Sequence, residues 1–576
     1  MSKEFSRRNF LKGAAAGAVG AAGMGILTAC SGSASATAGV NPAWVPEQWD
    51  YEADVVVCGY GAAGGMGAKT AIENGNSVLI LEKAPEEYAG GASTCFGGFL
   101  SVAGPETLMY SANDYLTQAT AEKLSNEMQK SIDWCLSSGL KAQQLMPTSH
   151  RADGTGRGFY AFLKAALNAC GANVLYETAA RNLIFDPSTK TVYGVRAEDK
   201  NGGSIYVKAN KGVLLATGNM CGNRDLVDRY FLPKEVDTPH VGSPYDTGDG
   251  FIMGMEIGAS VKSLNFRSME ITDFSLTKAS QEMGTGIMFL AAGPNKDARV
   301  YVNSKGQRIT NENIIWGHYK GNCPWLDFPH DSGYGFEGWV NLPFYVIFDS
   351  KLFDNEAIIP ADMNIYWAQA MNVYKWSADN KAELAKGWFA KGTTLDELVE
   401  NLATQSGHEK VDLEGLKAAV AEYNKASAGG KDEKFGRNGL LALDTAPYYA
   451  AELSTSIMYT MGGLRIGENA ETLDWNDQPI PGLYHAGDVG QVCEIVSQGV
   501  VGAMAYGAIG VRAICAAEKR DIPGPVKTII PAPTAEQQNS AAGGTPVTYT
   551  VPNAGGTDAI AGASQTDAVA GASQKK

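Results

Sequence analysis

Asp54-Val-Val-Val-Cys-Gly-Tyr-Gly-Ala-Ala-Gly64 is the stretch that decides the fold of this chain. The apolar, β-branched run before Gly59 is typical of a buried parallel strand. Gly59, Gly61 and Gly64 then form G-x-G-x-x-G, in which the glycines permit a tight turn, the close approach of a pyrophosphate and the close packing of a helix on the strand. The stretch therefore predicts a strand, a turn and a helix that together bind a dinucleotide.

The residues that follow complete a βαβ unit. A helix is expected from about Gly65 to Asn74, and a second strand from Ser77 to Leu81. Glu82 comes directly after this strand, where a carboxylate can bind the ribose hydroxyls of a dinucleotide. The free N–H groups at the start of the helix are expected to hold the phosphates.

Residues 1–30 are predicted to be an export signal. Ser6-Arg7-Arg8-Asn-Phe-Leu-Lys12 has the twin-arginine pattern, and the Ala/Gly-rich stretch after it is too short and too weakly apolar to span a membrane. Leu27-Thr-Ala-Cys30 is similar to a lipoprotein cleavage box, so lipidation is expected at Cys30. The alternative is that Cys30 is a small residue near an ordinary cleavage site. A lipid on Cys30 would anchor the mature protein to the outer face of a membrane.

Two low-complexity segments flank the part that is expected to fold. Residues 31–50 are rich in Ser, Ala, Gly and Pro and predict a flexible tether, and residues 521–576 predict a low-complexity tail. The tail contains a nine-residue repeat, at 557–565 and again at 566–574. A spacer or a cell-surface tail is the simplest interpretation of this composition.

Composition limits the partners and the sites of this chain. The formal net charge of −15 argues against nucleic acid as a partner. The nine cysteines form no C-x-x-C or C-x-x-C-H pattern. This gives no support for covalent haem, an iron–sulfur cluster or a zinc site, and no metal is expected.

Three later segments bear on the cofactor. Gly90–Gly98 follows the second strand closely, and its glycines and small hydroxyl residues suit close packing on a flavin and its phosphates. Gly212–Gly218 predicts another buried strand that ends in a turn of small residues. Pro481–Asp488 has a related pattern but comes late in the chain. A dinucleotide domain with parts near both ends of the chain implies an insertion in its middle.

Together these segments resemble the flavoproteins of the fumarate reductase and 3-ketosteroid dehydrogenase type. The resemblance covers residues 51–520 and also includes Thr247–Gly250, Asn311-Glu312 and Met461–Leu464. It implies FAD as the cofactor and an α/β fold, with a discontinuous, doubly wound FAD-binding domain and an inserted α+β capping domain.

The resemblance also implies the boundaries and the cofactor contacts. The FAD-binding domain is expected at 51–235 and 446–520, and the capping domain at 236–445. The residues expected to bind FAD are Gly59, Gly61, Ala62, Ala63, Gly64, Glu82, Lys83, Gly90, Gly91, Ser93, Thr94, Gly97, Gly98, Thr217, Gly218, Asp249, Tyr459, Asp488, Gly499 and Val500. Gly499 and Val500 begin a late helix whose N-terminus is expected to face the flavin, where the positive end of the helix dipole stabilises the anionic reduced form.

The chain departs from its relatives at the positions that hold the substrate. Fumarate-type reductases bind a dicarboxylate with arginines and histidines, because carboxylates need cationic donors. Their proton-donating arginine lies four residues after the Asn-Glu pair, where this chain has Trp316. Their histidine three residues before Met-Gly-Gly is replaced by Met458, and Glu494 or Gln498 stands in place of a last arginine. Such a pocket suits a larger, flatter and less charged molecule.

A carboxylate substrate nevertheless stays open at this point, because Arg267, Arg299 and Arg308 could reach one. The ketosteroid enzymes use tyrosines, one of them at the position of Trp316, and that tyrosine is absent here. His318 and Tyr319 are the nearest groups able to carry a proton. The alternative is that both are structural residues of the capping domain.

The candidate site therefore has two sets of residues. The candidate catalytic residues are His318, Tyr319 and Glu494, and the candidate substrate-binding residues are Trp316, Met458, Gln498 and Gly98.

The resemblance implies an exported, extracytoplasmic FAD-dependent reductase of an activated C=C bond, in an enone or an α,β-unsaturated acid other than fumarate. An exported chain with one dinucleotide site has no supply of NAD(P)H, so a membrane-bound cytochrome or quinol is the expected electron donor. Two alternatives are a ketosteroid-like dehydrogenase that introduces a C=C bond, and a flavoprotein that only relays electrons or binds a ligand.

Overall fold

The structure is a computed structural model that describes residues 42–111, 116–230, 239–262, 264, 269–289, 291, 294–312, 326–327, 338–339, 343–355, 357–359, 366–460, 462–490, 499–543 and 546–551. Several residues named above lie outside this part of the chain: Cys30, Arg267, Trp316, His318, Tyr319, Glu494 and Gln498.

A nine-stranded sheet forms the first part of the fold. β1 (Trp49–Cys58) pairs in parallel with β2 (Val78–Leu81) on one side and with β9 (Ser204–Leu215) on the other. β6 (Asn173–Leu175) continues the sheet beyond β2, and β20 (Pro479–His485) continues it beyond β9, both in parallel. The last six residues of β1 are all buried, as in a parallel strand covered on both faces. The α/β fold class predicted from the sequence is confirmed.

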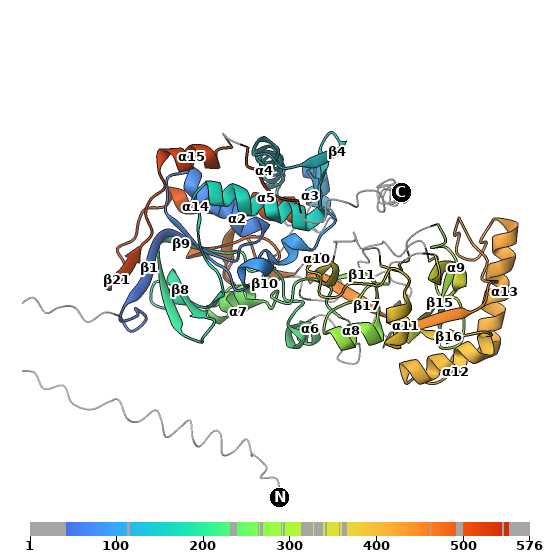
Figure 1. Cartoon of the computed structure of the whole chain (residues 1–576). Helices are drawn as coiled ribbons and strands as arrows, with labels where there is room; N and C mark the ends of the chain where they lie inside the picture. Colours follow the sequence, from blue (N-terminus) through green and yellow to red (C-terminus); the bar gives the residue numbers. More distant parts are fainter. Residues whose placement is uncertain are drawn as a thin grey trace, which may run out of the picture. The chain divides into compact units, whose positions relative to one another are not determined.

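The sheet also contains antiparallel strands and one strand from the end of the chain. β7 (Thr178–Asp186) and β8 (Thr191–Asp199) form an antiparallel meander with β9, and β19 (Glu471–Leu473) pairs antiparallel with β20. β21 (Val526–Ile529) pairs in parallel with the N-terminal half of β1, and Figure 1 shows the two strands side by side.

Helices pack on this sheet around α2 (Ala62–Glu73), which starts directly after Gly61 and therefore earlier than expected. α14 (Gly499–Ala516) and α5 (Thr155–Ala169) both pack against α2, and α4 (Gln118–Ser137) packs against α14. Among the residues that the structure describes, only α14 is long and apolar enough to cross a membrane, and 67% of its length is buried inside the protein. Its apolar character fits a helix packed within the domain.

The remaining elements of this part are short. They are η1 (Glu86–Tyr88), η2 (Gly91–Thr94), α3 (Pro105–Ser111), α6 (Arg224–Tyr230), α7 (Asp249–Glu256), and a three-stranded sheet of β3 (Phe99–Ser101), β4 (Ala142–Met146) and β5 (Ser149–Ala152).

A five-stranded antiparallel sheet forms the centre of the capping domain. Its strands are β11 (Met269–Leu276), β12 (Arg299–Asn303), β15 (Phe344–Asp349), β16 (Ala390–Gly392) and β17 (Tyr448–Thr460). The expected boundary at 446 is therefore wrong. β17 pairs with β11, β15 and β16, so the second part of the FAD-binding domain begins after residue 460.

The other described elements between residues 261 and 464 are helices and two-residue strands. They are α8 (Thr277–Met283), α9 (Ser350–Phe353), α10 (Trp367–Ala370), α11 (Lys381–Ala385), α12 (Leu395–Ser406), α13 (Leu413–Gly429), β10 (Val261–Lys262), β13 (Leu326–Asp327), β14 (Gly338–Trp339) and β18 (Gly463–Leu464).

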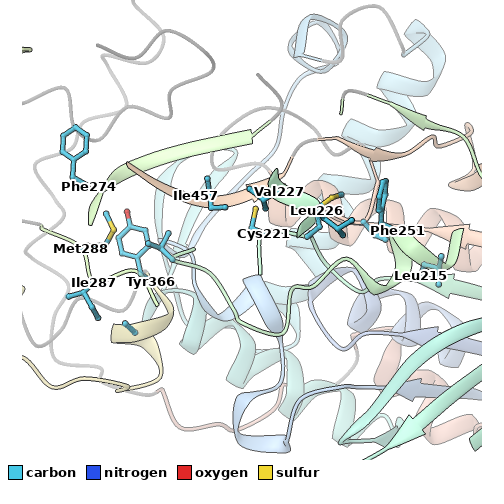
Figure 2. Close-up of a cluster of buried hydrophobic side chains, with 14 of the residues drawn as sticks. Leu215, Cys221, Leu226, Val227, Phe251, Phe274, Ile287, Met288, Tyr366 and Ile457 are labelled. Carbon is cyan, nitrogen blue, oxygen red and sulfur yellow. The ribbon is translucent and has the colours of Figure 1, made fainter. Parts of the chain in front are cut away.

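One hydrophobic cluster runs from the first sheet into the capping domain. Figure 2 shows Leu215, at the end of β9, in the same cluster as Phe251 of α7 and as Phe274, Met288 and Ile457 of the capping domain. The end of β9 and the capping sheet therefore share buried apolar contacts, which hold the loops after β9 in place.

The end of the chain differs from the expected tail. Residues 526–543 and 546–551, here called the C-terminal strap, contain β21 and α15 (Ala535–Ala541) and pack on the first domain. The indole N–H of Trp134 donates to the carbonyl of Ala541 at 2.8 Å, and the hydroxyl of Tyr549 accepts from the N–H of Lys141 at 2.8 Å. Residues of this stretch pack on helices of the first domain. The prediction of a low-complexity tail therefore applies only to the residues after the strap.

The expected tether at 31–50 also ends earlier than predicted. The ring of Trp44 stacks on Tyr193 with centroids 4.6 Å apart, and Trp49 is fully buried as the first residue of β1. The indole N–H of Trp49 donates to the carbonyl of Pro523 at 2.9 Å. These aromatic contacts join the two ends of the folded part.

Candidate functional site

The turn after β1 has no room for side chains. Gly59 has a φ of +105°, and a Cβ there would lie 2.2 Å from the carbonyl oxygen of Ala216 at the end of β9. A Cβ on Gly64 would lie 2.0 Å from the carbonyl oxygen of Gly59. The first and third glycines of the fingerprint are thus needed for the packing of α2 on the strand ends, as the sequence predicts.

The carboxylate of Glu82 is held at the end of β2 by two backbone groups. Its Oε2 accepts from the N–H of Tyr60 at 2.9 Å, and its Oε1 accepts from the N–H of Ala84 at 2.7 Å. Burial raises the pKa of Glu82, whereas these two backbone N–H groups lower it. Glu82 is thereby oriented beside the fingerprint turn, at the place where a ribose is bound in this kind of domain.

The loop 90–98 lies against the start of α2. The hydroxyl of Ser93 accepts from the N–H of Ala62 at 2.8 Å. Gly90 has a φ of +110°, and a Cβ there would lie 2.7 Å from the ring of Tyr160. Gly98 has a φ of +80°, and a Cβ there would lie 2.8 Å from the Cα of Thr155 in the first turn of α5. The loop therefore presents backbone and small side chains beside the helix N-terminus.

Three polar contacts tie the start of α7 to the segment after β9 and to the end of β2. The hydroxyl of Thr217 accepts from the N–H of Gly250 at 3.0 Å. The ammonium group of Lys83 pairs with the carboxylate of Asp249 at 2.8 Å and donates to the hydroxyl of Thr247. Asp249 and Lys83 therefore neutralise each other next to the fingerprint turn.

Two further carboxyls lie in the same region. Asp488 follows β20, and burial raises its pKa to about 6, although the side-chain amide of Asn219 lowers it. Asp246 is buried between Gly91 and Gly218, and burial raises its pKa well above the ordinary value. In the described part of the chain, no group of three or more His, Cys, Asp and Glu side chains is placed to hold a metal ion.

The second part of the domain reaches the fingerprint through close backbone contacts. Gly487 has a φ of +77°, and a Cβ there would lie 3.3 Å from the Cβ of Ala63. A Cβ on Gly507 of α14 would lie 2.2 Å from the carbonyl oxygen of Ala63. The result is a cradle of glycines at the N-terminus of α2, which fits the phosphates and the ribose of a dinucleotide.

Comparison with known proteins agrees with this geometry. A family model described as an FAD binding domain matches residues 54–511. The chain belongs to this FAD-binding family. Its cofactor is FAD, and the protein is an FAD-dependent oxidoreductase. Residues 4–23 match the twin-arginine translocation signal sequence, which supports export across a membrane.

This flavoprotein is similar in sequence to two curated relatives and similar in fold to one solved structure. The chain is 26% identical to a fumarate reductase (cytochrome) of Shewanella frigidimarina, over 76% of this chain and 72% of that protein. It is 25% identical to the digoxin reductase of Eggerthella lenta, over 88% of this chain and 94% of that protein. The fold matches the 3-ketosteroid Δ1-dehydrogenase of Sterolibacterium denitrificans with a TM-score of 0.62 at 19% identity, covering 81% of this chain and 99% of that one.

The predicted FAD-binding residues divide into four groups. The residues of the fingerprint, the end of β2, the loop 90–98 and the ends of β9 and β20 come together around the start of α2. Asp249 is the first residue of α7 and is paired with Lys83. Gly499 and Val500 are the first two residues of α14. Tyr459 lies on β17 in the capping sheet. The individual contacts of all these residues with FAD stay predictions.

Met458 also lies on β17, and its backbone contacts a histidine that sequence reasoning missed. The Nε2 of His240 lies 3.2 Å from the carbonyl oxygen of Met458. Burial lowers the pKa of His240 to about 4, so its imidazole is neutral at pH 7. His240 is distant from β17 in the sequence, and its only signal was its position a few residues before the predicted Thr247–Gly250 motif.

The structure corrects the expectation that Arg299 and Arg308 could reach a carboxylate of the substrate. Both arginines are buried around Glu312: Arg308 binds the carboxylate through two N–H groups at 2.6 Å each, and Arg299 donates to the backbone carbonyl of Glu312 at 2.9 Å. Arg437 and Asp432 complete this ion-pair network. Because protein groups already satisfy these guanidinium groups, neither is free to bind a substrate anion.

Proposed function

We propose that this protein is an exported FAD-dependent reductase of an activated C=C bond, in an enone or an α,β-unsaturated acid, and that fumarate is not its substrate. The names of the two curated relatives, a fumarate reductase and a digoxin reductase, support reduction as the class of reaction. The observation that carries the choice against fumarate is the ion-pair network at Glu312, which occupies Arg299 and Arg308.

The side chains expected at the substrate support the same choice. A dicarboxylate needs at least two cationic donors in a desolvated pocket. Met458 is apolar, and His240 next to it is neutral at pH 7 because burial lowers its pKa to about 4. Trp316, Gln498 and Gly98 are the other proposed contacts of the substrate. This set favours a flat, weakly charged molecule.

Each group has a proposed part in the reaction. Bound FAD, in its reduced form, supplies the hydride for the alkene. The cradle around α2 orients the cofactor, and the pocket residues orient the alkene beside it. His318, Tyr319 or Glu494 donates the proton to the neighbouring carbon.

The electrons are proposed to come from a membrane-bound cytochrome or quinol. The twin-arginine signal supports a location outside the cytoplasm, where NAD(P)H is not supplied. A lipid at Cys30 would hold the protein near such a donor. The anchor and the donor are both part of the proposal.

The test is turnover by the purified protein with a reduced viologen dye as electron donor. We expect fast oxidation of the dye with enones or unsaturated acids and little oxidation with fumarate. When NADH replaces the dye, we expect no oxidation of NADH and no reduction of the alkene. Replacing the proton donor should lower the rate by about 10²–10⁴-fold, so His318→Ala, Tyr319→Phe and Glu494→Gln are measured side by side.

Three outcomes would contradict the proposal. Fast turnover of fumarate would contradict the substrate class, and turnover with NADH alone would contradict the electron source. Reduction of the bound flavin without turnover of any alkene would favour a protein that only relays electrons. Oxidised enzyme incubated with saturated ketones and a dye acceptor tests the reverse reaction, desaturation.

A further inference from the structure

Asp246 has its carboxyl group inside the cofactor cradle. A Cβ on Gly91 would lie 3.1 Å from its Oδ1, and a Cβ on Gly218 would lie 2.6 Å from the same atom. The carboxyl therefore lies between these two glycines, which are both among the residues predicted to bind FAD. The residue is only 3% exposed.

The backbone holds Asp246 firmly in this place. Its N–H donates to the carbonyl of Ser243 at 3.0 Å, and its carbonyl accepts from the N–H of Gly222 at 2.8 Å. The carboxyl position is therefore set by two backbone hydrogen bonds rather than by a flexible loop.

Among the described residues, no cation forms an ion pair with this carboxyl, and the only hydrogen bond to its side chain is a long one, 3.4 Å from the Nδ2 of Asn219 to Oδ2. The positive charge of Lys83 acts on Asp246 from a distance, but Lys83 is paired with Asp249. A metal ion does not supply the missing positive charge either, because no cluster of ligands among the described residues is placed to bind one.

The groups that face Asp246 are mostly acidic. Asp488 after β20, Glu82 after β2 and Asp249 at the start of α7 all act on it by like-charge repulsion, and only Lys83 opposes them. The thiols of Cys95 and Cys221 are also close, and burial keeps both protonated by raising their pKa values.

Burial and repulsion favour the neutral form of Asp246. Burial is the largest cause that raises its pKa, and the charge of Asp488 is the next. A neutral carboxyl group carries an O–H and can donate a hydrogen bond, whereas an ionised one can only accept. A neutral carboxyl is therefore suited to lie beside an anionic ligand, because it can donate a hydrogen bond to the ligand without repelling it.

We propose that Asp246 is a further FAD-binding residue, whose protonated carboxyl donates a hydrogen bond to an oxygen of the diphosphate or the ribityl chain of FAD. An ionised carboxylate at the same place would repel the diphosphate. The proposal rests on the family assignment and not on the nature of the substrate.

The hydrogen bond makes the binding of FAD depend on a proton. The protonated form binds FAD better, so affinity is full below the pKa of Asp246 in the free protein and declines as the pH rises through it. One proton limits this decline to tenfold in the dissociation constant per pH unit. FAD is thus held more weakly at alkaline pH.

The test measures the dissociation constant of FAD from about pH 5 to about pH 9 by the fluorescence of released FAD. For the wild type we expect weaker binding toward high pH. Asp246→Asn keeps a donor that cannot ionise, so its affinity should change much less with pH. Asp246→Ala removes the donor and should weaken binding by about 5- to 100-fold at low pH.

Two controls separate this role from others. Asp225→Asn, on the exposed face of α6, should leave both the affinity and its pH dependence unchanged. Asp488→Asn tests the neighbouring carboxyl. If the pH dependence persists in Asp246→Asn and disappears in Asp488→Asn, the proposal is wrong, because Asp488 is then the titrating group.

A constant affinity of the wild type does not by itself decide the proposal, because a carboxyl that stays protonated throughout the range would give the same result. The comparison of Asp246→Ala with Asp246→Asn decides this case. If both variants bind FAD as tightly as the wild type at every pH, the side chain of Asp246 donates no hydrogen bond to the cofactor and the proposal is wrong.

Discussion

Glu312 shows how a buried charge in this chain depends on its partners. Its carboxylate is fully buried and is bound by Arg308 and Arg437. The network is not an argument for high stability in itself, because three arginines and their partners lose their hydration when they are buried. It does make each member difficult to replace.

The first prediction is that Glu312→Gln lowers the free energy of unfolding by about 3–5 kcal/mol, because it leaves buried guanidinium groups without a compensating charge. Denaturant unfolding measures the effect. Glu414→Gln is the matched control, since its side chain is 85% exposed and should change stability by less than about 0.5 kcal/mol. A loss below about 1 kcal/mol in Glu312→Gln would show that the network contributes little.

The second prediction concerns the fingerprint. Gly64→Ala should abolish or strongly weaken FAD binding, because the new Cβ would lie 2.0 Å from the carbonyl oxygen of Gly59 and would push α2 away from the strand ends. The absorbance of bound flavin after gel filtration is the measurement. Gly104→Ala serves as the control, since a Cβ there would meet nothing within 4 Å. Equal flavin content in the two variants would contradict the assigned role of Gly64.

Local patterns were enough to predict the fingerprint turn and the position of Glu82 after β2, but not the surroundings of Arg299 and Arg308. The fingerprint glycines and Glu82 lie within one short βαβ stretch. Their positions can therefore be predicted from the G-x-G-x-x-G spacing and from the end of the second strand. Arg299 and Arg308 carry no such signal. Their roles are decided by Glu312 and by Arg437, which lies 125 residues after Glu312 in the chain. Asp246 and His240 were missed for the same reason, because burial by distant segments defines both.

At the scale of elements, strands with strong periodic signals were predicted and strands defined by distant partners were misassigned. β1, β2, β9 and β20 appear where the apolar runs indicate. β17 mixes apolar residues with Ser and Thr, and it pairs with β15 and β11 in the capping sheet. Nothing within β17 shows which of two sheets it will join.

The C-terminal strap leads to the third prediction. A chain ending after Ile522 loses β21 and α15, and with them the contacts of Trp134 and of the N-terminal half of β1. We expect its thermal midpoint to fall by several degrees, since each buried apolar side chain contributes about 1.5–3 kcal/mol. A chain ending after Val551 keeps the strap and should melt like the full chain. Equal midpoints for the two truncated chains would mean that the strap adds no stability.

At the scale of the whole molecule, the signal at the start of the chain determines where the enzyme works. The fourth prediction is that Arg7→Lys combined with Arg8→Lys keeps the protein in the cytoplasm, because the export pathway reads the arginine pair. Cell fractionation with an antibody to the folded part is the measurement.

The lipid anchor proposed at Cys30 is tested in the same experiment. Cys30→Ser should still be exported but should be found in the soluble extracytoplasmic fraction rather than with the membrane. Cys58→Ser is the comparison, because Cys58 is buried in β1 and plays no part in anchoring. A Cys30→Ser protein that stays with the membrane would show that something other than a lipid at this position holds it there.

The pairing of the last strands with the first has a consequence for synthesis on the ribosome. β1 is among the first folded segments to be made, yet its neighbour β21 and the strand β20 beside β9 are made several hundred residues later. One side of the N-terminal half of β1 and one side of β9 therefore stay unpaired while the capping domain is translated, although β2 and β9 are already available to β1. Contacts this distant in sequence fold slowly and expose strand edges meanwhile. We expect this protein to acquire its flavin only after release from the ribosome, and chaperones to accompany it until then.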